Sequence, residues 1–121
     1  MGADGTLLIV DDNAAVCSAV QAYMLRVAGW TVVLVASDAG GGLTLAAAHG
    51  PRAIVLDNRM PGGNGIEVLA ELRRACPDAR IVMHTSEDTL DLRDRAEALG
   101  ADAIVTKGLP LDELAAALTA A

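Results

Sequence analysis

The sequence predicts an α/β fold in which helices cover both faces of a parallel sheet. Short apolar runs rich in β-branched residues alternate five times with longer stretches of helical periodicity, which is the pattern of such folds. The chain has 121 residues and 53% of them are hydrophobic, so it is long enough to bury one core. We therefore interpret residues 1–121 as a single domain.

Five apolar runs are typical of strands that are buried on both faces, as in parallel sheets. They are residues 6–10, 31–36, 53–57, 80–84 and 102–106. Connections between parallel strands are right-handed, so that helices lie on both sides of the sheet. We expect a doubly wound, flavodoxin-like (βα)5 sheet with strand order 2-1-3-4-5. Its topological switch point lies between the first and third strands, where ligands of such sheets bind.

The first two predicted helices differ in how well their sequences suit a helix. The first follows Asp12 and Asn13, either of which can cap it, and should end at Ala28–Gly29. Its apolar stripe consists of Val16, Val20, Met24 and Val27. The second spans residues 38–49, but its first turn contains three consecutive glycines, residues 40–42. Because glycine is unfavourable inside a helix, we expect this helix to start late or to fray.

The other three helices have recognisable start or stop signals. After Pro61-Gly62-Gly63, the spacing of Asn64 and Glu67 is that of a capping box. The apolar stripe of this helix consists of Ile66, Leu69 and Leu72. A charged helix over residues 88–99 ends at Gly100, and the last helix begins near Pro110 and continues to the end of the chain.

Composition excludes several classes of protein. The net charge of −7 argues against direct nucleic-acid binding by this domain. No apolar run approaches the roughly 20 residues that span a bilayer, and residues 1–10 combine an acidic start with an apolar run too short for a secretory signal. We expect a cytoplasmic location without membrane contact. Cys17 and Cys76 lack metal-ligand spacing and are interpreted as reduced thiols, and His49 and His84 as structural residues.

Polar side chains stand at the ends of four of the five apolar runs. They are Asp11, Asp12, Asp57, Thr85 and Lys107. Because the carboxyl ends of parallel strands meet at one edge of a sheet, we expect these side chains to lie together. Three adjacent carboxylates repel one another, and a divalent cation relieves this repulsion. An all-oxygen site of this kind suits Mg²⁺ or Mn²⁺.

The same residues can carry phosphoryl chemistry. One carboxylate can act as a nucleophile toward phosphorus and form an aspartyl phosphate. The Lys107 ammonium can neutralise charge that develops on the phosphoryl oxygens, and the Thr85 hydroxyl can form a hydrogen bond with one of them. The turn-rich loop after Asp57 can point a backbone carbonyl at the metal.

Four motifs, LIVDDN, IVLDNRMPGGNG, VMHTS and GADAIVTK, occur in an order and spacing that resemble a receiver domain of two-component response regulators. The resemblance covers nearly the whole chain. It implies that Asp57 accepts a phosphoryl group from the phosphohistidine of a histidine kinase or phosphotransfer protein. It also implies that Asp11, Asp12, Asp57 and the Arg59 backbone carbonyl hold Mg²⁺, and that Thr85 and Lys107 contact the phosphoryl group.

The family resemblance further implies a signalling role rather than that of an enzyme. Phosphorylation would reorganise the face formed by the helix over residues 88–99, the strand over 102–106 and the last helix. That face would then change its contacts with a downstream output domain or partner, or form a homodimer.

Residues at several positions make this chain distinctive among receivers. Ile104 stands where many receivers have an aromatic switch residue, and Gly108 stands where a proline often follows the lysine. A cis bond before a residue other than proline is unfavourable, so we expect a trans loop. Arg59 and Glu87 follow Asp57 and Thr85 by two residues. Our hypothesis is that this pair modulates phosphoryl lifetime by hindering the attacking water.

Three other functions are weighed against the phosphoacceptor. A receiver-like interaction module that needs no phosphate is compatible with Ile104 and Gly108, but the acidic triad with Thr85 and Lys107 argues against it. An aspartate-based phosphatase would usually have a second aspartate at the position of Arg59. Flavin binding on the same architecture would require Ser/Thr-rich phosphate loops and flanking aromatic residues, which this sequence lacks.

Overall fold

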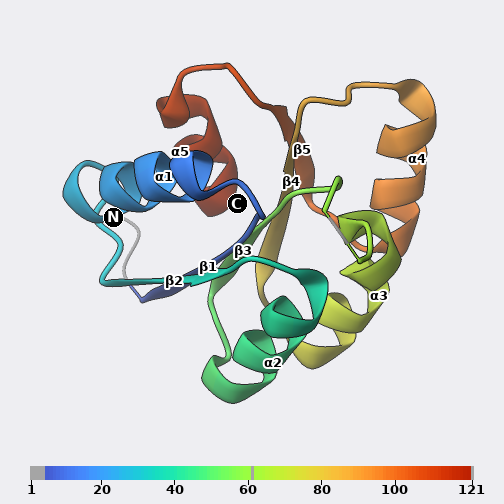
Figure 1. Cartoon of the computed structure of the whole chain (residues 1–121), viewed down its shortest axis with the longest axis horizontal. Coiled ribbons are helices and arrows are strands. Elements are labelled where there is room, and N and C mark those ends of the chain that lie inside the picture. Colours follow the sequence, from blue (N-terminus) through green and yellow to red (C-terminus); the bar gives the residue numbers. More distant parts are fainter. Residues whose placement is uncertain (1–4, 61, 121) are drawn as a thin grey trace.

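The computed structural model describes residues 5–60 and 62–120 and contains a five-stranded parallel sheet (Figure 1). The strands are β1 (Thr6–Val10), β2 (Val32–Ala36), β3 (Ala53–Leu56), β4 (Arg80–Thr85) and β5 (Ala103–Thr106). Their order is β2-β1-β3-β4-β5, and every pair is parallel. The predicted fold class and strand order are therefore confirmed. Residues 1–4 and Pro61, for which we expected turn-like structure, lie outside the described residues.

Five helices alternate with the strands and cover both faces of the sheet (Figure 1). They are α1 (Ala14–Arg26), α2 (Ala39–His49), α3 (Gly65–Ala75), α4 (Leu90–Leu99) and α5 (Leu111–Thr119). Helices α1 and α5 pack on one face and α2, α3 and α4 on the other. None of the helices in the described residues has the length and hydropathy required to cross a bilayer.

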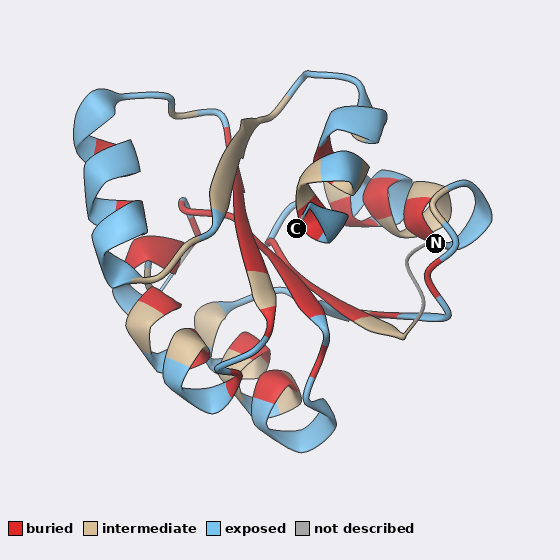
Figure 2. Ribbon diagram, turned by 180° about the vertical axis from the view of Figure 1, so that it is seen from behind, coloured by how far each residue is buried: buried red, intermediate tan, exposed pale blue. Residues whose placement is uncertain are grey.

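Two aliphatic clusters form the core because successive side chains of a strand point to opposite faces. On β1, Leu8 and Val10 face the cluster below α2 and α3, whereas Leu7 and Ile9 face the cluster below α1 and α5. All four side chains are buried, and Figure 2 shows the central strands as the most buried part of the molecule. Cys17 and Cys76 are buried free thiols, as expected.

Side-chain caps explain where several helices begin. The Asn13 side chain accepts a hydrogen bond from the Val16 N–H at 3.0 Å, and Thr89 accepts one from Leu92 at 3.1 Å. At α3 the Asn64 N–H donates to Glu67 Oε1 at 2.7 Å, as expected for a capping box. Because Thr89 is the cap of α4, this charged helix starts at Leu90, two residues later than predicted.

The end of α1 corrects one prediction. The helix stops at Arg26, two residues before Ala28, and Val27 is 66% exposed rather than part of the apolar stripe. Gly29 has φ +84° and turns the chain so that Trp30 enters the core. Val27 is therefore left on the outside of this turn. The buried side of the helix consists of Cys17, Val20 and Met24.

The start of α2 corrects a second prediction, because this helix begins at Ala39 without delay. Asp38 caps it by accepting the Gly41 N–H at 2.6 Å. A Cβ at Gly42 would lie 2.9 Å from Val10 Cγ2, so the absence of a side chain allows the helix to approach β1 closely. Tertiary packing thus outweighs the low helix propensity of the glycines.

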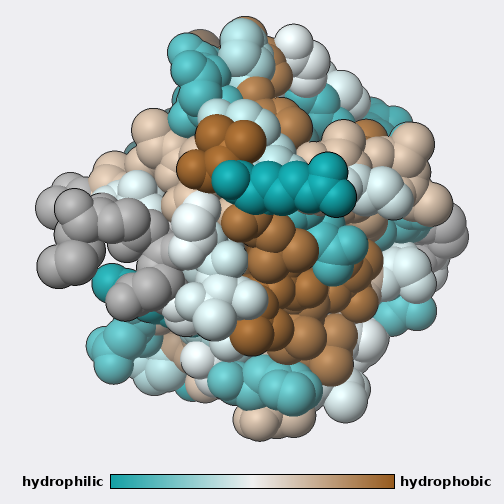
Figure 3. All heavy atoms as spheres, turned by 90° about the vertical axis from the view of Figure 1, so that its left-hand side faces the viewer, coloured by the Kyte–Doolittle hydropathy of each residue, from teal (hydrophilic) through white to brown (hydrophobic). Residues whose placement is uncertain are grey.

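The edge of the sheet at β2 is partly apolar. Its side chains Val32 and Val35 are exposed, and Figure 3 shows hydrophobic side chains gathered on the side of the molecule that lies at the left of Figure 1. The Gln21 side chain of α1 donates a hydrogen bond to the Val33 carbonyl at 3.0 Å. This carbonyl is therefore already engaged within the domain, which limits pairing of the edge with another strand.

Candidate functional site

Three carboxylates lie together at the carboxyl ends of β1 and β3. Asp11, Asp12 and Asp57 each present a carboxylate oxygen, and these oxygens lie within 4.8 Å of one another. Asp11 and Asp57 are buried, whereas Asp12 is exposed. The strand order brings the acids together because β1 and β3 are neighbours, although Ala53 follows Val10 by 43 positions in the sequence.

Lys107 connects this acidic cluster to the end of β5. Its Nζ lies 2.9 Å from Asp11 Oδ2 and 3.3 Å from Asp57 Oδ2. Its backbone N–H donates to the Thr85 carbonyl at 2.9 Å, which ties the loop after β5 to the end of β4. One ammonium therefore faces two buried carboxylates, and the site retains an excess of negative charge.

Burial and neighbouring charges shift the pKa values of Asp57 and Lys107. Burial, and then the charge of Asp11, raise the pKa of Asp57, while Lys107 and a backbone hydrogen bond from Asn58 act in the opposite direction. Burial disfavours the charged form of Lys107, but its contacts with Asp11 and Asp57 outweigh this effect and raise its pKa. The ammonium thus stays charged and the carboxylates remain incompletely neutralised.

The first turn of α1 orients Asp11. Asp11 Oδ1 accepts a hydrogen bond from the Asn13 N–H at 2.9 Å, and the Asp11 carbonyl accepts one from Cys17 Sγ at 3.2 Å. Since Lys107 contacts the other carboxylate oxygen, Asp11 is held from both sides. Asp12 is the exposed member of the cluster and faces solvent.

The backbone after Asp57 passes very close to the start of α3. Gly65 donates its N–H to the Asn58 carbonyl at 2.8 Å. A Cβ at Gly65 would collide with the Asp57 carbonyl oxygen and would lie 3.0 Å from Leu56 Cγ. Only glycine fits at this position, so α3 supports the Asp57 loop directly.

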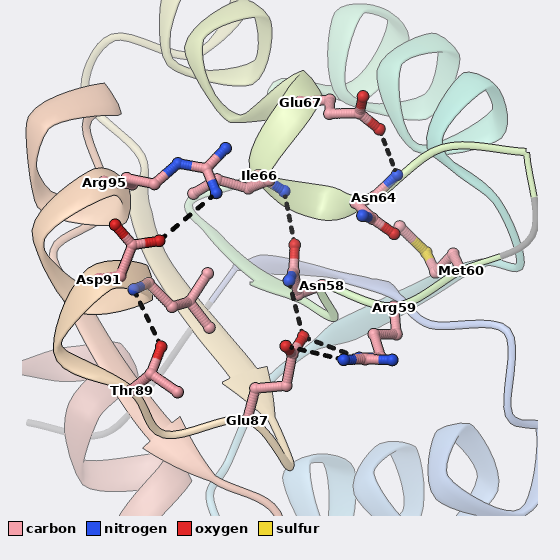
Figure 4. Close-up of a pocket in the computed structure, with 11 residues that line it drawn as sticks. Asn58, Arg59, Met60, Asn64, Ile66, Glu67, Glu87, Thr89, Asp91 and Arg95 are labelled. Atoms are coloured by element: carbon pink, nitrogen blue, oxygen red, sulfur yellow. Dashed lines mark hydrogen bonds and ion pairs between the residues drawn. The ribbon is translucent and has the colours of Figure 1, made fainter.

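Thr85 and Glu87 lie at the carboxyl end of β4 and in the loop that follows it. Thr85 is buried at the end of β4, beside Thr106 of β5, and its Oγ1 accepts the Glu87 N–H at 3.2 Å. Glu87 in turn pairs with Arg59, whose Nε lies 3.0 Å from Glu87 Oε1 and whose Nη2 lies 3.1 Å from Oε2 (Figure 4). The loops after β3 and β4 are thus joined by the ion pair expected from the sequence.

Asn58 is a site residue that sequence reasoning missed. It is buried, and its Nδ2 donates to Glu87 Oε1 at 2.9 Å while its Oδ1 accepts the Ile66 N–H at 3.0 Å (Figure 4). Hydrogen bonds from Arg59 and then from Asn58 lower the pKa of Glu87. The only available signal was a polar residue directly after a buried strand, and that signal does not reveal a partner 29 residues away.

The donor set suits a hard divalent cation. Carboxylate oxygens alone, with one exposed acid accessible to solvent, match the preference of Mg²⁺ or Mn²⁺ for a few oxygen ligands plus water. The unneutralised charge around Asp57 is a second reason why a cation would be favourable here.

Comparison with known proteins assigns this chain to a family. The model of the response regulator receiver domain matches residues 7–119. The chain belongs to this family. It is 36% identical to the transcriptional regulatory protein KdpE of Mycobacterium tuberculosis, over 95% of this chain and 50% of KdpE. It is also 36% identical to the response regulator MprA of Mycobacterium ulcerans, over 94% of this chain and 48% of MprA. The receiver domain therefore spans about half the length of these curated relatives.

Similar solved structures support the assignment to this family. A response regulator from Burkholderia pseudomallei, described with a phosphorylated aspartic acid, a calcium ion and citrate, has a TM-score of 0.89 at 27% identity. The match covers 95% of this receiver domain and 66% of that chain. A LuxR-family two-component response regulator from Aurantimonas has a TM-score of 0.84 at 30% identity, with 93% and 80% covered.

The two positions that we expected to differ from many receivers lie in β5 and in the loop after it. Ile104 is partly buried and packs against the cluster below α2 and α3. Gly108 has φ +95°, and all described peptide bonds are trans, as we expected for the loop after Lys107. A left-handed glycine therefore makes the turn that leads from Lys107 into α5.

Proposed function

We propose that this receiver domain accepts a phosphoryl group on Asp57 from the phosphohistidine of a histidine kinase or phosphotransfer protein. One observation carries the proposal: the buried Asp57 carboxylate shares a site with two further carboxylates and lies 3.3 Å from the Lys107 ammonium. The phosphorylated aspartic acid described for the Burkholderia response regulator supports it. On this proposal the 121 residues form one signalling domain and not an enzyme for external substrates.

The proposed reaction is a transfer between two covalent adducts. An oxygen of the Asp57 carboxylate attacks phosphorus, the P–N bond to the donor imidazole breaks, and the released imidazole takes up a proton. The product is a mixed anhydride of the Asp57 carboxylate and phosphate. Lys107 stabilises negative charge on the phosphoryl oxygens, and the Thr85 hydroxyl donates a hydrogen bond to one of them.

A divalent cation completes the proposed site. Asp11, Asp12, Asp57 and the Arg59 backbone carbonyl would hold Mg²⁺ or Mn²⁺. When bound, the ion supplies positive charge opposite the phosphoryl oxygens. Asp11 is already oriented by the Asn13 N–H, and Asp12 faces solvent, where it can exchange water for an ion.

Arg59 and Glu87 have a proposed role after transfer. Their ion pair joins the loops that follow Asp57 and Thr85, and on this proposal it restricts the approach of water to phosphorus. The pair therefore slows loss of the phosphoryl group, which is hydrolysis of the Asp57–phosphate bond to a free carboxylate and inorganic phosphate. Equal phosphoryl half-lives in the parent and R59A proteins would contradict this role.

Output is proposed to pass through α4, β5 and α5. Phosphorylation reorganises this face, and Ile104 repacks there without the aromatic ring of many receivers. The face then contacts an output domain, a partner protein or a second copy. The name of KdpE as a transcriptional regulatory protein supports an output in gene regulation, while the charge of −7 argues against DNA contact by this domain itself.

Incubation with acetyl phosphate and Mg²⁺, followed by intact-mass measurement, tests the proposal. We expect one added phosphoryl group in the parent protein, and none in D57N or in the presence of a chelator. An unmodified parent protein would favour an interaction module that acts without phosphate. Continuous release of phosphate from many small esters would instead favour an aspartate-based phosphatase.

A further inference from the structure

Asn58 forms hydrogen bonds with two elements beside the acidic site. Its carbonyl accepts the Gly65 N–H at 2.8 Å. Its side chain accepts the Ile66 N–H at 3.0 Å and donates to Glu87 Oε1 at 2.9 Å (Figure 4). One buried residue directly after Asp57 therefore connects the start of α3 with the loop after β4.

Only one of the two possible orientations of the Asn58 side-chain amide is favourable. Turning the amide over would point its NH₂ group at the Ile66 N–H and its oxygen at the Glu87 carboxylate. Both contacts would then join like groups in a buried position, where unsatisfied polar groups are unfavourable. Asn58 is therefore held from the side of α3 and presents its NH₂ group to Glu87.

The Arg59–Glu87 pair depends on this anchor. The Arg59 side chain is 74% exposed, and an ion pair with so exposed a partner holds its geometry weakly by itself. Glu87 is less exposed, at 28%, because its carboxylate also reaches the buried Asn58 amide. The Glu87 N–H bond to Thr85 Oγ1 places the backbone of Glu87 beside the site.

We propose that Asn58 is a positioning residue that fixes the Glu87 carboxylate, and through it the Arg59 guanidinium, at the edge of the Asp57 site and thereby prolongs the lifetime of the phosphoryl group. This inference rests on the proposed phosphorylation of Asp57. It assigns to Asn58 an effect on hydrolysis that is separate from its support of α3, because its two side-chain bonds involve different atoms.

The substitution N58D separates these two bonds. The variant keeps an oxygen that accepts the Ile66 N–H, but it replaces the donor to Glu87 by a second acceptor, which repels the carboxylate. After phosphorylation and removal of the donor, we expect N58D to lose its phosphoryl group about three- to tenfold faster than the parent protein. This change corresponds to about 0.7–1.4 kcal/mol in the barrier.

A rescue and a matched control complete the experiment. In N58D/E87Q the glutamine amide can donate to the new carboxylate, so phosphoryl loss should be slower than in N58D alone. N64D makes the same chemical change in the same loop, but the N–H of Asn64 bonds Glu67 and not Glu87, so its rate should stay within about twofold of the parent.

The outcomes distinguish this inference from the proposed function. A parent protein that gains no phosphoryl group overturns both. A phosphorylated parent with equal half-lives in N58D overturns the inference alone, and faster loss without rescue by E87Q overturns it as well, since the effect would then come from α3.

A double-mutant cycle checks the route through Arg59. In R59A the guanidinium that Glu87 holds is absent, so adding N58D should accelerate phosphoryl loss less than it does in the parent protein. An equal acceleration in both backgrounds would contradict positioning of Arg59 through Glu87.

Discussion

The two ends of the sheet differ in how well their polar groups are matched by hydrogen-bond partners. At the amino ends of β4 and β5, Arg73 donates to the carbonyls of Ala79 and Gly100 at 2.6 and 2.7 Å and to Asp102 Oδ2 at 2.8 Å. The same Asp102 oxygen accepts the Ile81 N–H at 2.8 Å. Donors and acceptors match, so this end joins α3, β4 and β5 into one hydrogen-bonded unit.

The carboxyl ends of the strands hold charges that do not match. Asp11, Asp12 and Asp57 face one ammonium, and burial raises the pKa of Asp57 above its usual range. His84, one residue before Thr85, is buried with no hydrogen-bond partner for Nδ1 among the described residues. The polar groups at the amino end are thus matched by hydrogen bonds, whereas the carboxyl end retains charges and a buried nitrogen that are not matched, which fits the cation and phosphoryl site proposed there.

Replacement of Arg73 should produce the largest effect on stability. R73A removes the Arg73 donor from the carbonyls of Pro77, Ala79 and Gly100 and from Asp102, which keeps only the Ile81 N–H. We therefore expect the free energy of unfolding to fall by about 2–4 kcal/mol in chemical denaturation. The control is R74A, since Arg74 is the exposed neighbour on the same helix. Phosphoryl uptake per folded molecule should not change, and a specific loss of uptake in R73A would contradict the separation of the two ends.

His84 should make stability depend on pH. Burial, and then Lys107, lower its pKa to about 4 in the folded state. The unfolded chain therefore binds more protons between pH 6.5 and 4, and stability is lost as the pH falls through this range. Relative to H84L, the parent should lose up to about 3 kcal/mol of unfolding free energy.

Unfolding curves at several pH values measure this loss. The control is H49Q, because His49 is exposed at the end of α2 and its replacement should preserve the pH dependence of the parent. Parallel stability curves for the parent and H84L between pH 6.5 and 4 would show that His84 does not contribute.

The smallest expected effect is stabilisation by Mg²⁺. An ion that binds only the folded state at ten times its Kd adds about 1.4 kcal/mol to the free energy of unfolding. We expect thermal unfolding to show this gain in the parent and not in D12N. The control D78N removes an exposed acid near the amino end of β4. Equal gains in D12N and the parent would place the ion elsewhere.

The sequence predicted those features that depend on local patterns combined with one topological rule. Apolar runs located all five strands to within one residue at either end, and parallel strands then brought Asp11, Asp57 and Lys107 to one edge. The capping residues Asn13 and Asn64 were likewise recognisable because their partners lie within one helical turn.

Features that depend on distant partners could not be predicted. Asn58 and Arg73 act through residues 27 to 29 positions away, and nothing in the neighbouring sequence identifies those partners. The three glycines of α2 misled the prediction for the same reason, since Gly42 is favourable only through its contact with Val10. Local propensity is overridden wherever a helix must approach the sheet unusually closely.

The tight fit of Gly65 against the Asp57 backbone limits how this domain can diversify. Gly65 has no unusual backbone angle, so the restriction comes from space alone. In a library randomised at this position, nearly every folded clone should retain glycine. Adaptation to new partners must therefore proceed through the exposed loops and helix faces, while the start of α3 stays unchanged.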